Sequence, residues 1–176
     1  MIFTATPLAG AHVLDLDRRE DERGFFARSF CQHEFAEHGL NPRIAQCNVS
    51  FNAKRGTLRG MHYQAAPHEE AKVVRCTQGA VWDVIVDLRR DSPTFKRWHG
   101  VELTAENRRA LYIPEGVAHG FQTLTDDAEL LYLMSEFYEP DAARGVRWDD
   151  PAFGIEWPLP NPRISERDRG FPRFAL

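Results

Sequence analysis

Short segments of alternating apolar and polar residues recur roughly every ten residues along this chain, and they limit the possible folds more than any other feature. In the clearest of them, AVWDVIVDLRR, the even-numbered apolar residues from Trp82 to Leu88 face one side of a strand. The residues that face the other side are Val81, Asp83, Ile85 and Asp87. Similar β-type segments with turn sequences between them are KVVRC (72–76), KRWHGVEL (96–103), ALYIP (110–114) and ELLYLMSEFY (129–138). Many short strands with little helix predict an all-β sandwich or barrel.

The remaining segments predict little regular structure. Only CQHEFAEHG, which ends at Gly39, has a helical pattern, and a turn is expected near ISERDRGF (164–171). After residue 139, prolines preclude long regular elements, and they stand at Pro140, Pro151, Pro158, Pro160, Pro162 and Pro172. We therefore expect an irregular, Pro-rich C-terminal tail wrapped over the barrel.

Length and charge exclude several classes of protein. A chain of 176 residues is expected to form one domain over residues 1–176. Its net charge of −4 does not favour binding to nucleic acid or to a membrane surface. The three cysteines, Cys31, Cys47 and Cys76, form no CxxC pair, and we find neither a secretory signal nor a membrane span. We expect a cytoplasmic protein with reduced thiols.

One motif raises the question of a metal ion. PEGVAHGF, which contains His119, resembles the second signature of the cupins, small double-stranded β-barrels. In metal-binding cupins a His-x-His pair and a glutamate complete the site, but the matching stretch here is HYQ, beginning at His62. A carboxamide is a poor ligand for a transition metal, which favours a metal-free pocket. The alternative is a metal-dependent cupin that uses His62, His119 and either Glu69 or Glu70.

Collinear motifs across nearly the whole chain are more specific than any single one. They resemble, in the same order, those of dTDP-4-dehydrorhamnose 3,5-epimerase and its sugar-nucleotide epimerase relatives. The motifs are DERGFFARSF (21–30), QCNVSFN (46–52), GTLRGMHYQ (56–64), the segment 71–98, YIPEGVAHGFQTL (112–124), LLYLMSEFYEP (131–140), WDDPAFGIEWP (148–158) and ISERD (164–168). The resemblance implies a metal-free cupin jelly roll without a cofactor. It also implies a homodimer that epimerises C3 and/or C5 of a nucleoside-diphosphate 4-keto-6-deoxyhexose.

The resemblance also implies catalytic roles for four residues. His62 matches the family's base, and Asp168 matches the carboxylate that pairs with this imidazole. Lys72 matches the cation beside the ketone oxygen, where negative charge develops as the α-proton leaves. Tyr132 matches the acid that delivers a proton to the opposite face of the sugar, which inversion requires.

The same resemblance implies a set of substrate-binding residues. These are Arg23 and Arg59 at the phosphates, Gln46 and Asn48 in the cavity, His119 near the sugar or phosphates, and Phe26 on the nucleobase, together with Arg28 and Tyr138. Residues near Arg23 to Arg28 are expected to reach the neighbouring subunit's pocket. Tyr138 follows Tyr132 by six residues, so a regular strand would place both phenols on one face.

Gly60 lies between Arg59 and His62, in a segment that otherwise reads as a strand. A missing side chain there would let the substrate or a neighbouring backbone approach closely. Side chains of neighbouring strand residues point in opposite directions, so Arg59 and Gly60 face opposite sides of a regular strand. Only a bulge would change the side that Arg59 faces relative to Met61 and His62.

Two further interpretations stay open beside the metal-dependent cupin. Many relatives carry a glutamate in place of Arg28 and an acidic residue within the stretch here read as Ala142-Ala143-Arg144. A different nucleotide-linked ketosugar, or inversion at C3 alone or C5 alone, is therefore an alternative. The last interpretation is a sugar-nucleotide binding module without catalytic activity.

Overall fold

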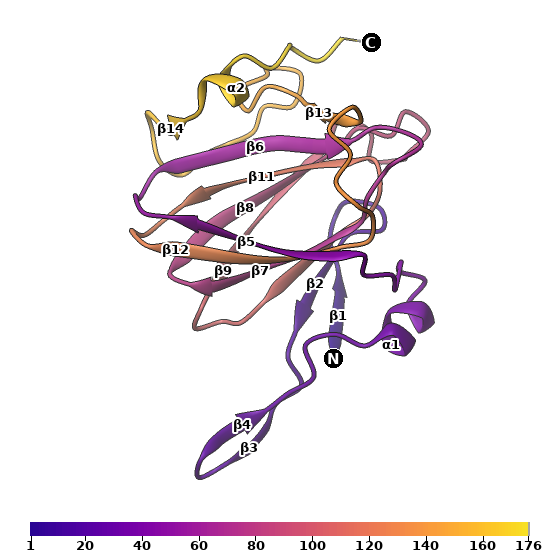
Figure 1. Ribbon diagram of the computed structural model, residues 1–176, viewed down its shortest axis with the longest axis vertical. Coiled ribbons are helices and arrows are strands. Elements are labelled where there is room, and N and C mark those ends of the chain that lie inside the picture. Colours follow the sequence, from indigo (N-terminus) through magenta and orange to yellow (C-terminus); the bar gives the residue numbers. More distant parts are fainter. Residues whose placement is uncertain (176) are drawn as a thin grey trace.

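Two antiparallel sheets lie face to face in the computed structural model, which describes residues 1–175 (Figure 1). The first sheet has the strand order β1 (Ile2–Ala5), β2 (His12–Asp15), β10 (Ala110–Ile113), β7 (Lys72–Gln78), β12 (Ala128–Met134) and β5 (Gln46–Asn52). The second has the order β13 (Ala143–Gly145), β6 (Thr57–Gln64), β11 (Val117–Thr123), β8 (Ala80–Asp87) and β9 (Trp98–Thr104). In addition, β14 (Arg163–Ile164) pairs with β6 in parallel. This architecture confirms the predicted all-β cupin barrel.

The main core fills the space between the two sheets. Val74, Leu111 and Leu130 from the first sheet pack with Ile85 and Phe121 from the second, and all five are buried. Burying a side chain of this size contributes roughly 1.5–3 kcal/mol before the loss of conformational entropy. The alternation predicted for β8 is confirmed. Its odd-numbered residues Val81 and Ile85 lie in this core, whereas its even-numbered apolar residues pack on the outer face of the second sheet.

The C-terminal tail covers that outer face. Val146 and Phe153 from the tail pack against Met61, Val84 and Ala118, as predicted from the prolines (Figure 1). The expected turn near residue 166 is the short helix α2 (Glu166–Arg169), which Ser165 caps by accepting a hydrogen bond from the backbone N–H of Asp168. The tail therefore brings the end of the chain back to β6.

An N-terminal arm extends away from the barrel. It consists of β3 (Arg19–Asp21) and β4 (Gly24–Phe26), which form a hairpin at the lower end of the molecule (Figure 1). The predicted helix follows as α1 (Gln32–Glu37), which buries Phe35 beside the first sheet. No helix within residues 1–175 is long and apolar enough to cross a bilayer.

A bulge interrupts β6 at Gly60. His62 pairs with His119 and Arg59 pairs with Phe121, so β6 has two residues between these pairs where β11 has only one, Gly120. A Cβ atom on Gly60 would lie 2.6 Å from the Cα atom of Gly120, so a side chain would not fit. The neighbouring backbone, rather than a substrate, therefore accounts for this glycine. The bulge lets both Arg59 and His62 face the inside of the barrel.

A buried carboxylate at the end of β8 is predicted to stabilise the fold. Asp87 accepts hydrogen bonds from Arg89 (2.7 Å), Ser92 (2.5 Å) and Thr94 (2.6 Å). Burial alone would raise the pKa of Asp87, but these hydrogen bonds outweigh it and lower the pKa from 3.8 to about 2. A lowered pKa contributes stability above pH ~4 that is lost as the pH falls toward 2. The corresponding free energy is about 2 kcal/mol.

We expect Asp87→Asn to lower the free energy of unfolding at pH 7 by about 2–3 kcal/mol, measured by urea denaturation. The difference from wild type should shrink between pH 4 and pH 2, because wild type then loses the same charge. Asp91→Asn is the matched control, since Asp91 is exposed and should change stability by less than about 0.5 kcal/mol. Equal effects of the two substitutions would contradict this assignment.

Candidate active site

A cavity of about 210 Å³ lies between the two sheets. The first sheet contributes Asn48, Val49 and Ser50 from β5, Lys72 from β7, and Tyr132 and Met134 from β12. The second sheet contributes Arg59 and His62 from β6 and His119 and Phe121 from β11. Six of the residues predicted from sequence thus line one cavity, with imidazoles on one wall and a lysine and a phenol on the other.

His62 is held by Asp168, as expected. Its Nε2 lies 2.9 Å from Oδ1 of Asp168, and the backbone N–H of Gly60 donates to Oδ2 at 3.2 Å. Burial alone would raise the pKa of Asp168, but the hydrogen bond from His62 and that from Gly60 lower it below its ordinary value. Asp168 therefore remains a carboxylate at neutral pH. A carboxylate beside Nε2 favours the tautomer that carries the proton there and leaves the Nδ1 lone pair free.

Tyr132 lies on the opposite sheet. Burial, with a further contribution from the negative charge of Asp83, raises the pKa of the Tyr132 phenol above its ordinary value, although Arg59 opposes the shift. Its ring packs edge-on to that of His119, with the ring centroids 6.0 Å apart. The phenol therefore keeps its proton at neutral pH and is able to act as an acid.

Lys72 is buried in the cavity wall and has an acidic partner. Its Nζ lies 2.8 Å from Oε1 of Glu70, and each of the two side chains is only 7% exposed. Pairing makes it possible to keep an ammonium group buried and charged. Glu70 is one of the two glutamates considered as metal ligands, and here it contacts a cation in the same chain.

His119 and Asp83 form a second buried pair near Lys72, and Asp83 was not predicted from the sequence to be a site residue. Nε2 of His119 lies 2.9 and 3.0 Å from the two oxygens of Asp83. Burial raises the pKa of Asp83, and the charges of His119 and Lys72 oppose the shift. A signal was present, because alternation had placed Asp83 on the same face of β8 as the core residues Val81 and Ile85.

Arg59 also has a partner that the sequence did not reveal. Its Nε donates to Oδ1 of Asn52 at 2.7 Å, and Asn52 is itself buried, with its amide bound to the backbone oxygen of Ala128. A guanidinium held at one end presents its remaining N–H groups toward the cavity. Asn52 belongs to the QCNVSFN motif, although nothing in the motif singles it out.

Two of the predicted binding residues lie at the edge of the cavity or outside it. Asn48 lines the cavity, but Gln46 accepts a hydrogen bond from the backbone N–H of Tyr138 at 3.0 Å. Tyr138 is 55% exposed and lies beyond the end of β12 at Met134. The expectation that one strand places Tyr132 and Tyr138 on the same face is therefore wrong, because the strand ends four residues before Tyr138.

The predicted residues of the N-terminal arm do not reach this chain's own cavity. Arg23 pairs with Asp21 and Arg28 pairs with Glu34, while Phe26 is 76% exposed. None of the arm's residues lines the cavity between the sheets. Their expected role therefore depends on a second subunit.

Residues 1–175 contain no group of three or more His, Cys, Asp or Glu side chains placed to hold a metal ion. Nε2 of His62 and Nε2 of His119 each contact an aspartate, and Glu70 contacts Lys72. The ligand set that the metal-dependent alternative needs is therefore not assembled here.

Comparisons with known proteins identify the family of this chain. The family model described as dTDP-4-dehydrorhamnose 3,5-epimerase matches residues 5–175. The Shigella flexneri protein of that name is 49% identical over 156 residues, which cover 88% of this chain and 86% of the relative. The Streptomyces niveus dTDP-4-dehydrorhamnose 3-epimerase is 42% identical over 163 residues, covering 92% and 78%.

A similar solved structure is that of the Bacillus anthracis dTDP-4-dehydrorhamnose 3,5-epimerase with TDP and PPi bound. It has a TM-score of 0.94 and 40% identity, and the match covers 98% of this chain and 99% of that one. The match extends over both sheets and the C-terminal tail, and so over every element that contributes to the cavity. The chain therefore belongs to the dTDP-4-dehydrorhamnose 3,5-epimerase family.

Proposed function

We propose that this protein epimerises C3, C5 or both in a nucleoside-diphosphate 4-keto-6-deoxyhexose, with dTDP-4-dehydro-6-deoxy-D-glucose as the foremost substrate. The observation that supports this best is the position of His62 and Tyr132 on opposite walls of one cavity. Inversion of a carbon α to a ketone requires a base on one side and a proton donor on the other. The names of the relatives supply the substrate class.

In the proposed reaction, Nδ1 of His62 removes the proton from the carbon next to the ketone. The imidazolium that forms is stabilised by Asp168 at 2.9 Å. Electrons from the broken C–H bond move to the ketone oxygen and form an enolate. Lys72 is buried in the wall of the same cavity, and its positive charge stabilises the enolate oxygen.

Tyr132 then donates its phenolic proton to the opposite face of the same carbon. The raised pKa of the phenol keeps this proton in place until the enolate forms. The tyrosinate and the imidazolium exchange protons with solvent to restore the enzyme. No cofactor is consumed, because the substrate and product have the same oxidation state.

The substrate's anionic half is proposed to bind Arg59 at the cavity and, from a second subunit, Arg23 and Phe26 of the arm. Three features support a homodimer: the arm is exposed, it lies away from its own cavity, and it carries Arg23, which matches a phosphate contact of the family. We further propose that residues 1–176 form one domain, since both sheets and the tail contribute to the site. The cytoplasm is the proposed compartment, in accord with three free cysteines.

The proposed function is tested by proton NMR in deuterated water with a panel of nucleotide-linked 4-keto sugars. We expect loss of the proton signals at C3 and C5 of the dTDP-linked sugar, followed by appearance of the inverted product. Because relatives named 3,5-epimerase and 3-epimerase have similar identities to this chain, loss at C3 alone identifies the narrower activity. No exchange with any sugar in the panel would overturn the proposal.

Metal dependence is tested on the same purified protein. We expect full exchange activity after incubation with a chelator, and less than one equivalent of iron, manganese or zinc per chain by elemental analysis. The reason is that residues 1–175 contain no group of three or more His, Cys, Asp or Glu side chains placed to hold a metal ion. A stoichiometric metal whose removal abolishes activity would favour the metal-dependent alternative.

A further inference from the structure

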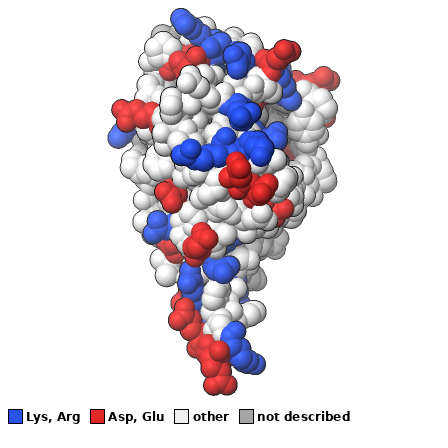
Figure 2. All heavy atoms as spheres, turned by 90° about the vertical axis from the view of Figure 1, so that its left-hand side faces the viewer, with Lys and Arg blue, Asp and Glu red and all other residues white. Residues whose placement is uncertain are grey.

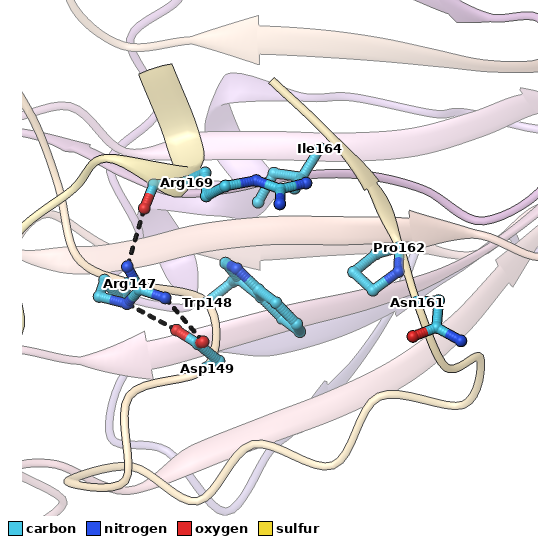
Figure 3. A pocket seen from close by; sticks show the side chains of 7 residues that line it. All are labelled: Arg147, Trp148, Asp149, Asn161, Pro162, Ile164 and Arg169. Atoms are coloured by element: carbon cyan, nitrogen blue, oxygen red, sulfur yellow. Dashed lines mark hydrogen bonds and ion pairs between the residues drawn. The ribbon is translucent and has the colours of Figure 1, made fainter. Parts of the chain in front are cut away.

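A second cavity, of about 380 Å³, lies outside the barrel in the C-terminal tail (Figure 3). One loop of the tail contributes Arg147, Trp148 and Asp149, and the segment around α2 contributes Asn161, Pro162 and Arg169. None of these residues lines the cavity between the sheets. Its volume is in the range of small-molecule sites.

One wall of this cavity is fixed by an ion pair. The Arg147 guanidinium donates to both oxygens of Asp149 at 2.7 Å and to the backbone oxygen of Arg169 at 2.9 Å. The hydrogen bonds from Arg147 hold the pKa of the Asp149 carboxyl below its ordinary value. The ion pair fixes the loop, and the hydrogen bond from Arg147 to Arg169 joins the two segments of the tail. The shape of the cavity is therefore defined before any ligand binds.

A flat apolar surface lies beside this pair. Figure 3 shows the Trp148 ring between the Arg147–Asp149 pair and Pro162. Trp148 is only partly buried. Its backbone oxygen accepts a hydrogen bond from the indole N–H of Trp157 at 2.9 Å, which holds the loop in place. Exposed faces of tryptophan and proline offer contact to a sugar ring or a nucleobase.

Charged and polar groups without partners surround this surface. The side chains of Arg169 and Asn161 are exposed and form no hydrogen bond or ion pair within residues 1–175. Arg163, Glu166 and Arg167 are also exposed on the same segment, whereas the charge of Asp168 is used by His62. At the upper end of the molecule, Figure 2 shows Lys and Arg side chains with acidic side chains on either side of them.

We propose that this tail cavity is a second binding site for a ring that carries a phosphate, a chemistry shared by nucleotides and sugar phosphates. The ring contacts Trp148 and Pro162, the phosphate pairs with the free guanidinium of Arg169, and Asn161 hydrogen-bonds a hydroxyl or phosphate oxygen. An anion fits here because Arg169 is the charged residue lining the cavity that has no partner within residues 1–175.

The site also has a connection to the catalytic cavity. Arg169 follows Asp168 in α2, a helix of four residues, and Asp168 contacts His62. A phosphate bound to Arg169 acts on the helix that positions the catalytic carboxylate. We therefore expect occupancy to change the exchange rate at C3 and C5 severalfold, a consequence that rests on the proposed function, whereas binding itself does not.

Isothermal titration of the full chain with TDP, glucose 1-phosphate, glucose and inorganic phosphate tests the proposal. We expect wild type to have a tail site, in addition to the catalytic cavity, for TDP, for glucose 1-phosphate or for both. Arg169→Gln should remove the tail site and Arg59→Gln should weaken the other. If the ligand of the tail site is a sugar phosphate, glucose 1-phosphate should bind there more than tenfold more tightly than glucose or phosphate alone. If the ligand is a nucleotide, TDP should bind there more than tenfold more tightly than glucose or phosphate alone.

Three outcomes would overturn the proposal: no second site per chain for either TDP or glucose 1-phosphate, equal binding of these ligands to wild type and Arg169→Gln, or equal affinity for phosphate alone. Asn161→Gly is a second variant that keeps the positive φ of 52° at this position and should weaken the tail site without disturbing the fold. If no nucleotide sugar exchanges at all, the titration still decides whether the tail site exists.

Discussion

Replacing His62 by alanine is expected to lower both solvent exchange and net epimerisation by about 10²–10⁴-fold, the usual contribution of a general base. The cavity contains a second imidazole, His119, but its Nε2 contacts both oxygens of the buried Asp83. The two histidines face each other across β6 and β11, so His119 is the group best placed to replace His62. Its fixed orientation explains why we do not expect it to restore the reaction.

The partner of the base gives an independent measurement. Asp168→Asn is expected to lower exchange with little change in KM, because an amide no longer stabilises the imidazolium and is able to donate to Nε2, which favours the wrong tautomer. His68→Ala is the matched control for His62→Ala, since His68 is exposed and lies outside the cavity. Both effects are measured as deuterium uptake by NMR. Wild-type uptake in His62→Ala would remove the base assignment.

Local chemistry explains which parts of the fold were predictable from the sequence. The faces of β8 followed from alternation because burial on a strand has a period of two residues. The irregular tail followed from its prolines, which lack the N–H that regular elements need. The end of β12 at Met134 was missed, because apolar and aromatic residues continue past it to Tyr138 and only tertiary contacts decide where pairing stops.

The pairing between distant residues could not be predicted in the same way. Asp83 meets His119 because the register of β8 and β11 makes them diagonal neighbours, and no local pattern encodes a register. The bulge at Gly60, which turns both Arg59 and His62 inward, depends on Gly120 in a strand about sixty residues away. The resemblance to a known family supplied what alternation could not, namely which polar residues share a cavity.

Tyr132→Phe is expected to separate exchange from inversion. The variant keeps the ring that packs against His119 but lacks the phenolic proton, while His62, Asp168 and Lys72 remain. Deuterium should therefore still enter C3 and C5 from the side of the base, with the starting configuration retained. Net formation of the inverted product should fall by about 10²–10⁴-fold.

The matched control for Tyr132→Phe is the same substitution at a tyrosine outside the cavity. Tyr63→Phe removes the same hydroxyl from a residue that packs on the outer face of β6, so it should leave both exchange and inversion unchanged. A variant at Tyr132 that inverts the sugar at the wild-type rate would show that water or another group delivers the second proton. A variant that loses exchange and inversion together would show instead that the phenol is required for enolate formation. Retained exchange without inversion is the only result that places the acid and the base on opposite sides of the sugar.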